Sequence, residues 1–239
     1  MVPRTESMIK SLIIKIFNSF FKQNWKIKSD TIVFLYSFSF YNGNMSKVVL
    51  GMTMSLDGFI NDRDGSVDRL FSDLMLGNVL HESILNNEIM QEALQNTGAV
   101  VMGKNTFLMG GDPDYYADAY EFQVPIFVLT SHPPEKKPKE NENLTFTFVT
   151  DGIEAAIALA KPAAGGKDVV VLGGKSTAQQ ALHSGLVDEI QVDIMPVLLG
   201  GGMRFFEKFD GDIIELQKIE IVEMPIRTNL KFRVVKKSF

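Results

Sequence analysis

From Met45 onward, the sequence alternates short apolar, β-branched runs with stretches whose apolar residues recur at helical spacing. The runs that predict strands are Lys47–Met54, Ala99–Met102, Ile126–Thr130, Leu144–Val149, Asp168–Leu172 and Leu186–Met195. The stretches that predict helices are Glu82–Gln95, Asp151–Ala160 and Ser176–His183. Repeated strand–helix–strand units favour a parallel sheet with helices on both faces, because each parallel strand is reached by a crossover connection. The sequence therefore predicts an α/β domain.

The C-terminal part has a different pattern. Ile213–Met224 and Asn229–Lys236 alternate like a pair of antiparallel strands. The helix over 151–160 is expected to be capped by Asp151 or Thr150, with Glu154 in its first turn. We thus expect a central, mostly parallel sheet flanked by helices, with an antiparallel C-terminal edge.

The first 44 residues differ from the rest in composition. They carry six basic and two acidic residues, a net charge of +4, and nine of the 24 aromatic residues; residues 45–239 carry a net charge of −9. No apolar run there reaches the roughly 20 residues of a membrane-spanning helix. We interpret residues 1–44 as an N-terminal extension outside the fold, with a basic targeting or membrane-surface segment as the alternative, and residues 45–239 as one domain.

The lack of cysteine excludes whole classes of site. With no Cys and three His, the chain has no disulfide scaffold and no thiolate metal site, and we predict no metal. The net charge of −5 argues against a nucleic-acid surface. A small-molecule partner, no membrane contact of the folded domain and a cytoplasmic location are the expectations.

Two strands end in glycine directly before a predicted helix or hydroxyl-bearing turn. These segments are Val100–Thr106 and Val171–Thr177. Glycine lets a phosphate approach the backbone, and helix N-termini and hydroxyls donate hydrogen bonds to it, so the pair suggests a pyrophosphate site. Neither segment is a nucleoside-triphosphatase loop, and no Gly-x-Gly-x-x-Gly follows a strand. A third cluster, Pro196–Gly202, suits either a sharp turn or a flat ligand.

The order of these motifs resembles a known family. The matching segments are Met54–Ile60, Val101–Thr106, Phe127–Ser131, Gly173-Gly174, Leu186–Ile190 and Pro196–Gly202 with Phe205-Phe206. Together they resemble the bacterial bifunctional deaminase-reductase C-terminal domain family, part of the dihydrofolate reductase-like superfamily. The resemblance spans about Lys47 to Lys236 and implies a cleft that holds NADPH beside a small heterocycle.

The resemblance also implies roles for individual residues. The cofactor phosphates would be held by Gly103, Lys104 and Thr106, and the pyrophosphate would lie against Gly173, Gly174, Ser176 and Thr177. The adenosine ribose and its 2′-phosphate would lie near Thr130 and Ser131. The nicotinamide would be bordered by Thr53. Lys104 stands where an arginine is more usual in the family, which makes the preference for NADPH over NADH less firm. No deaminase half with its zinc ligands precedes this domain in the chain.

Asp57 is the candidate proton-handling residue, on the loop beside the expected cleft. The alternative is that Asp57 is a turn residue that caps backbone. Four further aspartates, Asp62, Asp64, Asp68 and Asp73, follow, and the sequence does not distinguish among them. The resemblance implies an NADPH-dependent reductase of a pyrimidine or pterin-like compound, similar to 5-amino-6-(5-phosphoribosylamino)uracil reductase of riboflavin biosynthesis, and a homodimer. The alternatives are dihydrofolate reductase-type activity and a non-catalytic nucleotide-binding or regulatory protein.

Overall fold

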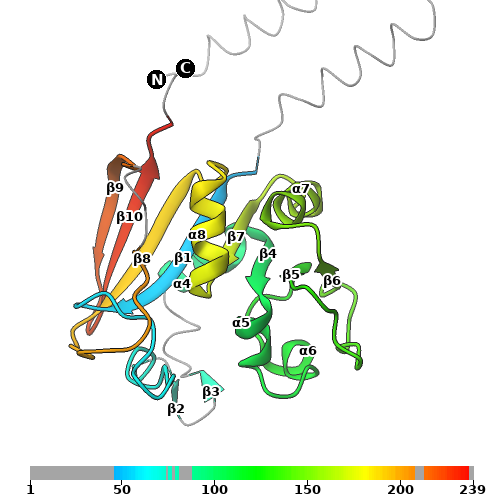
Figure 1. Cartoon of the computed structure of the whole chain (residues 1–239), viewed down its shortest axis with the longest axis horizontal. Coiled ribbons are helices and arrows are strands. Elements are labelled where there is room, and N and C mark those ends of the chain that lie inside the picture. Colours follow the sequence, from blue (N-terminus) through cyan, green and yellow to red (C-terminus); the bar gives the residue numbers. More distant parts are fainter. Residues whose placement is uncertain (1–45, 74, 77–78, 81–87, 208–212, 237–239) are drawn as a thin grey trace, which may run out of the picture. The chain divides into compact units, whose positions relative to one another are not determined.

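The computed structural model describes residues 46–73, 75–76, 79–80, 88–207 and 213–236 (Figure 1). The predicted extension over residues 1–44 and positions 82–87 of the first predicted helix lie outside these residues. An eight-stranded sheet runs through the described part, and its strands occur in the order β6-β5-β4-β7-β1-β8-β10-β9. The strand bounds are β1 Val48–Ser55, β4 Thr97–Gly103, β5 Ile126–Leu129, β6 Phe146–Val149, β7 Asp168–Leu172, β8 Glu189–Met195, β9 Leu216–Glu223 and β10 Thr228–Val234.

The sheet is parallel over its first six positions and antiparallel at one edge. β1 pairs parallel with β7 and β8, and β4 pairs parallel with β5 and β7. β10 pairs antiparallel with both β8 and β9. This arrangement confirms the predicted mostly parallel sheet with an antiparallel C-terminal edge.

Helices cover both faces of the sheet. On one face, α7 (Ile153–Ala163) and α8 (Lys175–His183) bury small and branched side chains against β1, β4 and β7. On the other face, α5 (Lys104–Leu108) and α6 (Tyr115–Ala119) pack an aromatic cluster against β4 and β5. All seven residues of β4 are buried, as expected for a strand that has neighbours on both sides and helices above and below.

Helix boundaries show where sequence patterns carry less information. The predicted side-chain cap of the helix over 151–160 is wrong: α7 begins after Gly152, which has φ 95° and no side-chain cap. The left-handed backbone at Gly152 turns the chain without a capping side chain. The short α5 and α6, and a small hairpin of β2 (Met75–Leu76) and β3 (Val79–Leu80), were not predicted from the sequence.

Three helices begin where parallel strands end. α5 follows β4 directly, α7 follows β6 and α8 follows β7, so their N-termini lie at the same edge of the sheet (Figure 1). A fourth helix, α4 (Glu88–Asn96), leads directly into β4. The carboxyl edge of an open α/β sheet is where such folds bind ligands.

Candidate active site

A large cavity opens along the carboxyl edge of the parallel strands and over one face of β1, β7 and β8. Its volume is about 1180 Å³, above the 300–1,000 Å³ that is usual for one drug-sized ligand. Residues of α4, including Met90, Ala93 and Asn96, contribute to its wall. The space is large enough for a dinucleotide together with a second small molecule.

All ten residues that the sequence analysis assigns to cofactor binding line this cavity. They are Thr53, Gly103, Lys104, Thr106, Thr130, Ser131, Gly173, Gly174, Ser176 and Thr177. They come from the ends of four strands, β1, β4, β5 and β7, and from the helices that follow two of them. The fold therefore brings together segments that are more than 120 residues apart in the sequence. Their individual roles stay predictions.

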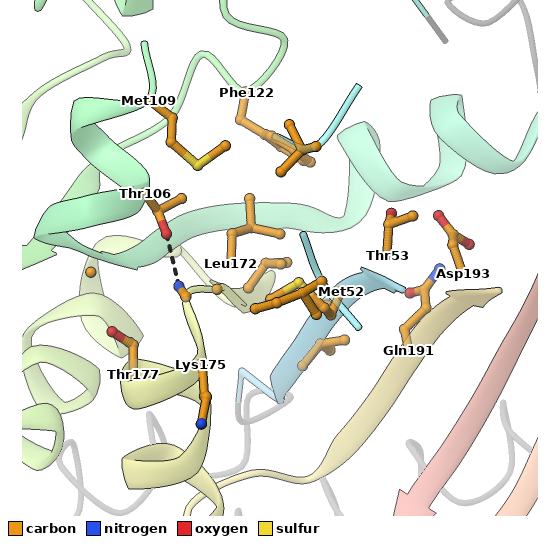
Figure 2. A pocket seen from close by; sticks show the side chains of 18 of the residues that line it. Met52, Thr53, Thr106, Met109, Phe122, Leu172, Lys175, Thr177, Gln191 and Asp193 are labelled. Carbon is orange, nitrogen blue, oxygen red and sulfur yellow. Dashed lines mark hydrogen bonds between the residues drawn. The ribbon is translucent and has the colours of Figure 1, made fainter. Parts of the chain in front are cut away.

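The two glycine turns are joined directly to each other. The Gly103 amide donates a hydrogen bond to the Gly173 carbonyl at 3.3 Å, and the Gly174 amide donates to Thr106 Oγ1 at 2.7 Å (Figure 2). A Cβ on Gly103 would lie 2.4 Å from Thr177 Oγ1. Glycine is required at position 103 because α8 begins in contact with the end of β4.

The helix N-termini at this cavity have no side-chain caps. Gly174 precedes α8 and Gly152 precedes α7, and neither helix has a side-chain hydrogen bond at its N-cap. Both glycines line the cavity. The first turn of a helix carries free N–H groups and a partial positive charge, so these ends favour an anionic ligand.

Hydroxyls and one lysine complete this end of the cavity. The Thr130 hydroxyl is buried and donates to the His132 carbonyl at 2.9 Å, whereas Ser131 is exposed. Lys104 is also exposed at the cavity wall, while Lys175 is ion-paired with Glu207. Lys104 is thus better placed than Lys175 to meet an anion.

Asp57 does not line the cavity; its carboxylate fastens one loop to another. It accepts hydrogen bonds from the Ser55 hydroxyl at 2.6 Å and from the amides of Leu199 and Gly200 at 3.1 and 2.8 Å. The Ser55 hydroxyl, followed by the two amides, lowers the pKa of Asp57 below its ordinary value of 3.8, against the opposing effect of desolvation. The geometry matches the alternative reading, a residue that caps backbone.

The glycines at 200–202 make room for the segment after β1. A Cβ on Gly202, which has φ 123°, would lie 2.0 Å from the Asn61 carbonyl oxygen, and a Cβ on Gly201 would lie 2.4 Å from Arg63 Nε. Asn61 Oδ1 accepts from the Met203 amide at 2.8 Å. Of the two interpretations of this cluster, the structure shows close backbone packing between two loops.

Among the four aspartates that the sequence left undistinguished, Asp73 is the one in a buried ion pair. Its carboxylate accepts from Arg227 Nε at 2.8 Å and also from Arg227 Nη2. Arg227 is 2% exposed and also donates to Asp193 Oδ2 at 3.1 Å. Burial alone would lower the pKa of the Arg227 guanidinium, but Asp73 and Asp193 outweigh this effect and raise it.

A row of polar side chains on the cavity face of β8 was not predicted from the sequence. Gln191 and Asp193 line the cavity, as does Asn229 of β10, whereas Ile190 and Val192 point into the apolar core. The available signal was the strict alternation of Glu189, Gln191 and Asp193 with apolar residues, since period-two alternation separates the two faces of a strand. An inner strand with one polar face indicates a ligand-facing surface.

The chain resembles known proteins in sequence and in fold. The family model of the RibD C-terminal domain matches residues 46–225. The chain belongs to this family. Two relatives from Bacillus subtilis strain 168 support the match: Uncharacterized protein YyaP is 25% identical over 172 residues, covering 69% of this chain and 82% of that protein, and Uncharacterized protein YwjB is 24% identical over 169 residues, covering 70% and 86%.

Solved structures with similar folds include members of the RibD type. A candidate riboflavin biosynthesis protein from Shewanella sp. PV-4 shares 22% identity with a TM-score of 0.60 over 80% of this chain and 99% of that chain. A Thermotoga maritima diaminohydroxyphosphoribosylaminopyrimidine deaminase/5-amino-6-(5-phosphoribosylamino)uracil reductase shares 13% identity. Its TM-score is 0.56 over 83% of this chain and 59% of that chain. The Saccharomyces cerevisiae riboflavin biosynthesis reductase Rib7 shares 16% identity. Its TM-score is 0.51 over 87% of this chain and 100% of that chain. At these identities the likeness shows a shared fold, the dihydrofolate reductase-like fold expected above.

The described residues contain neither a candidate membrane span nor a candidate metal cluster. In residues 46–73, 75–76, 79–80, 88–207 and 213–236, no helix combines the length and apolar character of a membrane span. Within the same ranges, no three His, Cys, Asp or Glu side chains gather in a way that would hold a metal ion.

Proposed function

We propose that this member of the RibD C-terminal domain family is an NADPH-dependent reductase of a small heterocyclic compound of the pyrimidine or pterin type, similar to 5-amino-6-(5-phosphoribosylamino)uracil reductase. One observation carries the proposal. Segments from four separate strand ends line a single cavity together with two uncapped helix N-termini. Such a surface favours a ligand with several phosphate groups.

The residues at the cavity fit a dinucleotide phosphate. The free N–H groups at the start of α8 and the Ser176 hydroxyl would bind the pyrophosphate, and Lys104 would add a positive charge. The exposed Ser131 hydroxyl would contact the adenosine ribose with its 2′-phosphate. The nicotinamide would then lie along β1, where Gly51 and Thr53 line the cavity and Thr53 contributes a hydroxyl.

Bound NADPH would supply a hydride to the carbon of a C=N or C=O bond of the substrate, and water or a side chain would supply the proton to its nitrogen or oxygen. The protein's task in such a reaction is to hold donor and acceptor in contact and to exclude water. Gly103, Thr106 and Gly173 perform the first task by fixing the two phosphate-facing turns to each other. Met90 and Ala93 of α4 would serve the second, because they line the same cavity with apolar side chains.

Binding of NADPH, measured by calorimetry, tests the proposal. We expect micromolar binding to the unmodified protein and a roughly tenfold loss in Lys104→Ala, since one charge-assisted contact contributes about 1.5 kcal/mol. Lys137→Ala, an equally exposed lysine that does not line the cavity, is the matched control. NADPH oxidation with a panel of aminopyrimidines, pteridines and dihydrofolate would then separate a reductase from a regulatory binder. No cofactor binding at micromolar concentration would refute both.

We also propose that the chain forms a homodimer through β9. This edge strand exposes Leu216, Ile219 and Ile221, with Ile221 at 51%, and a long apolar edge strand is usually covered by another chain. Sedimentation velocity of the unmodified protein should show a dimer. Ile221→Lys should shift it toward monomer, whereas Leu159→Lys, at an equally exposed position on α7, should not. A monomeric unmodified protein would contradict the proposal.

A further inference from the structure

Asp193 presents a carboxylate to the cavity from the middle of β8. Its side chain is 27% exposed, and it lines the cavity with Thr53 and Gln191. Arg227 Nη1 donates to Oδ2 at 3.1 Å, and Asn229 Nδ2 donates to Oδ1 at 2.6 Å. Each oxygen is therefore held by one donor from the protein.

The support of this carboxylate is itself rigid. The guanidinium of Arg227 is buried and donates through Nε and Nη2 to the two carboxylate oxygens of Asp73. Its Nη2 also donates to the Leu70 carbonyl at 3.2 Å. A carboxylate has about four acceptor positions, so two donors from the protein leave acceptor capacity on both oxygens. Arg227 supplies one positive charge against the two carboxylates of Asp73 and Asp193, which leaves the trio with a negative charge.

A second polar group stands beside Asp193. Thr53 of β1 is the direct strand partner of Asp193, so the two side chains share one face of the sheet. Figure 2 shows the Thr53 hydroxyl and the Asp193 carboxylate next to each other and pointing to the same side. Thr53 is only 8% exposed, and it lines the cavity beside Asp193. A threonine hydroxyl can both donate and accept a hydrogen bond, so at the cavity wall it offers a contact to a polar ligand atom.

We propose that Asp193 is the residue that selects the substrate, by accepting two adjacent N–H donors from one edge of an amino-substituted nitrogen heterocycle. The proposal rests on the proposed function, because it takes Thr53 to border the nicotinamide. The neighbouring Asp193 then faces the ring that receives the hydride. The two oxygens accept the paired N–H groups, and the Thr53 hydroxyl contacts the next polar atom of the same ring.

The charge of the site distinguishes this ligand from others. An edge that presents carbonyl oxygens would face a carboxylate and would be repelled. A single carboxylate held by an arginine and an amide offers a cation few ligands, and no cluster of metal-ligating side chains occurs in the described residues. Neutral N–H pairs fit because charge-assisted hydrogen bonds to a carboxylate are stronger than neutral ones.

The test compares two uracils that differ in one group. 6-Aminouracil has adjacent N1–H and amino donors, whereas 6-methyluracil has a methyl group in place of the amine. We expect the unmodified protein to bind 6-aminouracil at least tenfold more tightly than 6-methyluracil in ligand-observed NMR titrations. Asp193→Asn should abolish this difference, because an amide cannot accept two N–H groups on two oxygens. Equal binding of both uracils by the unmodified protein, or an unchanged preference in Asp193→Asn, would overturn the proposal.

Asp188→Asn is the matched control. Asp188 precedes β8, is 31% exposed and is ion-paired with Lys236, and it does not line the cavity. Its substitution should leave the preference for 6-aminouracil unchanged. Should Asp193→Asn fail to show a cooperative melting curve, Thr53→Val tests the same spot: it should lower the affinity for 6-aminouracil severalfold, and full retention of affinity would count against the proposal.

Titrations without and with saturating NADPH keep the two proposals apart. A preference for 6-aminouracil that depends on Asp193 in the free protein, with no NADPH binding, would support the selecting role of Asp193 and refute the reductase. NADPH binding that Asp193→Asn leaves intact, with no preference between the uracils, would support the cofactor site and refute the role of Asp193.

Discussion

At the scale of single residues, burial and hydrogen bonding separate carboxylates that hold the structure from one that faces the cavity. Asp57 and Asp73 were both candidates from the sequence. In the structure, the carboxylate of Asp57 accepts hydrogen bonds from the neighbouring loop at Gly200, and that of Asp73 accepts from Arg227. Asp193 also has protein partners, but it lines the cavity and keeps acceptor capacity. The residue type alone does not distinguish these cases.

Asp57→Asn should lower the melting temperature at neutral pH. The two carboxylate oxygens of Asp57 accept hydrogen bonds from Ser55, Leu199 and Gly200, whereas an asparagine amide has only one oxygen that can accept. The pKa of Asp57 is lowered in the folded state, so its stabilisation is complete above pH 3.8, the ordinary value, and is lost as the pH falls through the lower folded value. The difference in melting temperature between the unmodified protein and Asp57→Asn should therefore become smaller toward pH 3, as measured by thermal unfolding followed by circular dichroism. Asp64→Asn, at an exposed position, is the control. A gap that is constant with pH would contradict this role.

At the scale of elements, two joints hold the site in shape. One joins the β4–α5 and β7–α8 turns through Gly103, Thr106 and Gly174. The other joins the start of β10 to the segment that follows β1, through Arg227 and Asp73. Both joints connect parts of the chain that are distant in sequence, so each fixes one wall of the cavity relative to another.

Arg227→Leu should destabilise the domain by about 3 kcal/mol in urea unfolding, because it leaves two carboxylates without their partner. The double variant Arg227→Leu, Asp73→Asn should recover part of this loss, since one unpaired charge is removed as well. Lys139→Leu, which breaks the exposed pair with Asp118, should lower the free energy of unfolding far less, because water screens this pair. An equal decrease in the free energy of unfolding for Arg227→Leu and Lys139→Leu would argue against a structural role for the ion pairs of Arg227.

At the scale of the whole molecule, the described strands, the helices that cover them and the described lining of the cavity come from residues after position 45. The family model likewise begins at residue 46. A chain that starts at Met45 should therefore contain everything that the fold requires.

A variant that lacks residues 1–44 should unfold at the same urea concentration as the full chain and bind NADPH with the same affinity. Urea unfolding followed by circular dichroism, and calorimetry with NADPH, measure the two quantities on both proteins. A lower midpoint, or a weaker affinity in the shortened protein, would show that the N-terminal segment contributes to the domain.

Local sequence patterns determined the strands, the longer helices and the fold class. Apolar alternation and glycine turns depend on neighbouring residues, so β7 was predicted with its observed bounds and the antiparallel pair β9–β10 was anticipated. Motif resemblance, rather than periodicity, supplied the ten cavity residues and the family. Short helices such as α5 gave no signal, because five residues do not complete two turns.

Only the tertiary structure decided which polar groups are free. Whether Asp57 meets ligand or backbone depends on the loop at Leu199 and Gly200, some 140 positions away. Likewise, the place of Asp193 beside Thr53 results from the pairing of β8 with β1. Sequence spacing sets which face of a strand a side chain occupies. Which neighbour satisfies its hydrogen bonds is set by how distant strands and loops pack, and that packing is a property of the whole chain.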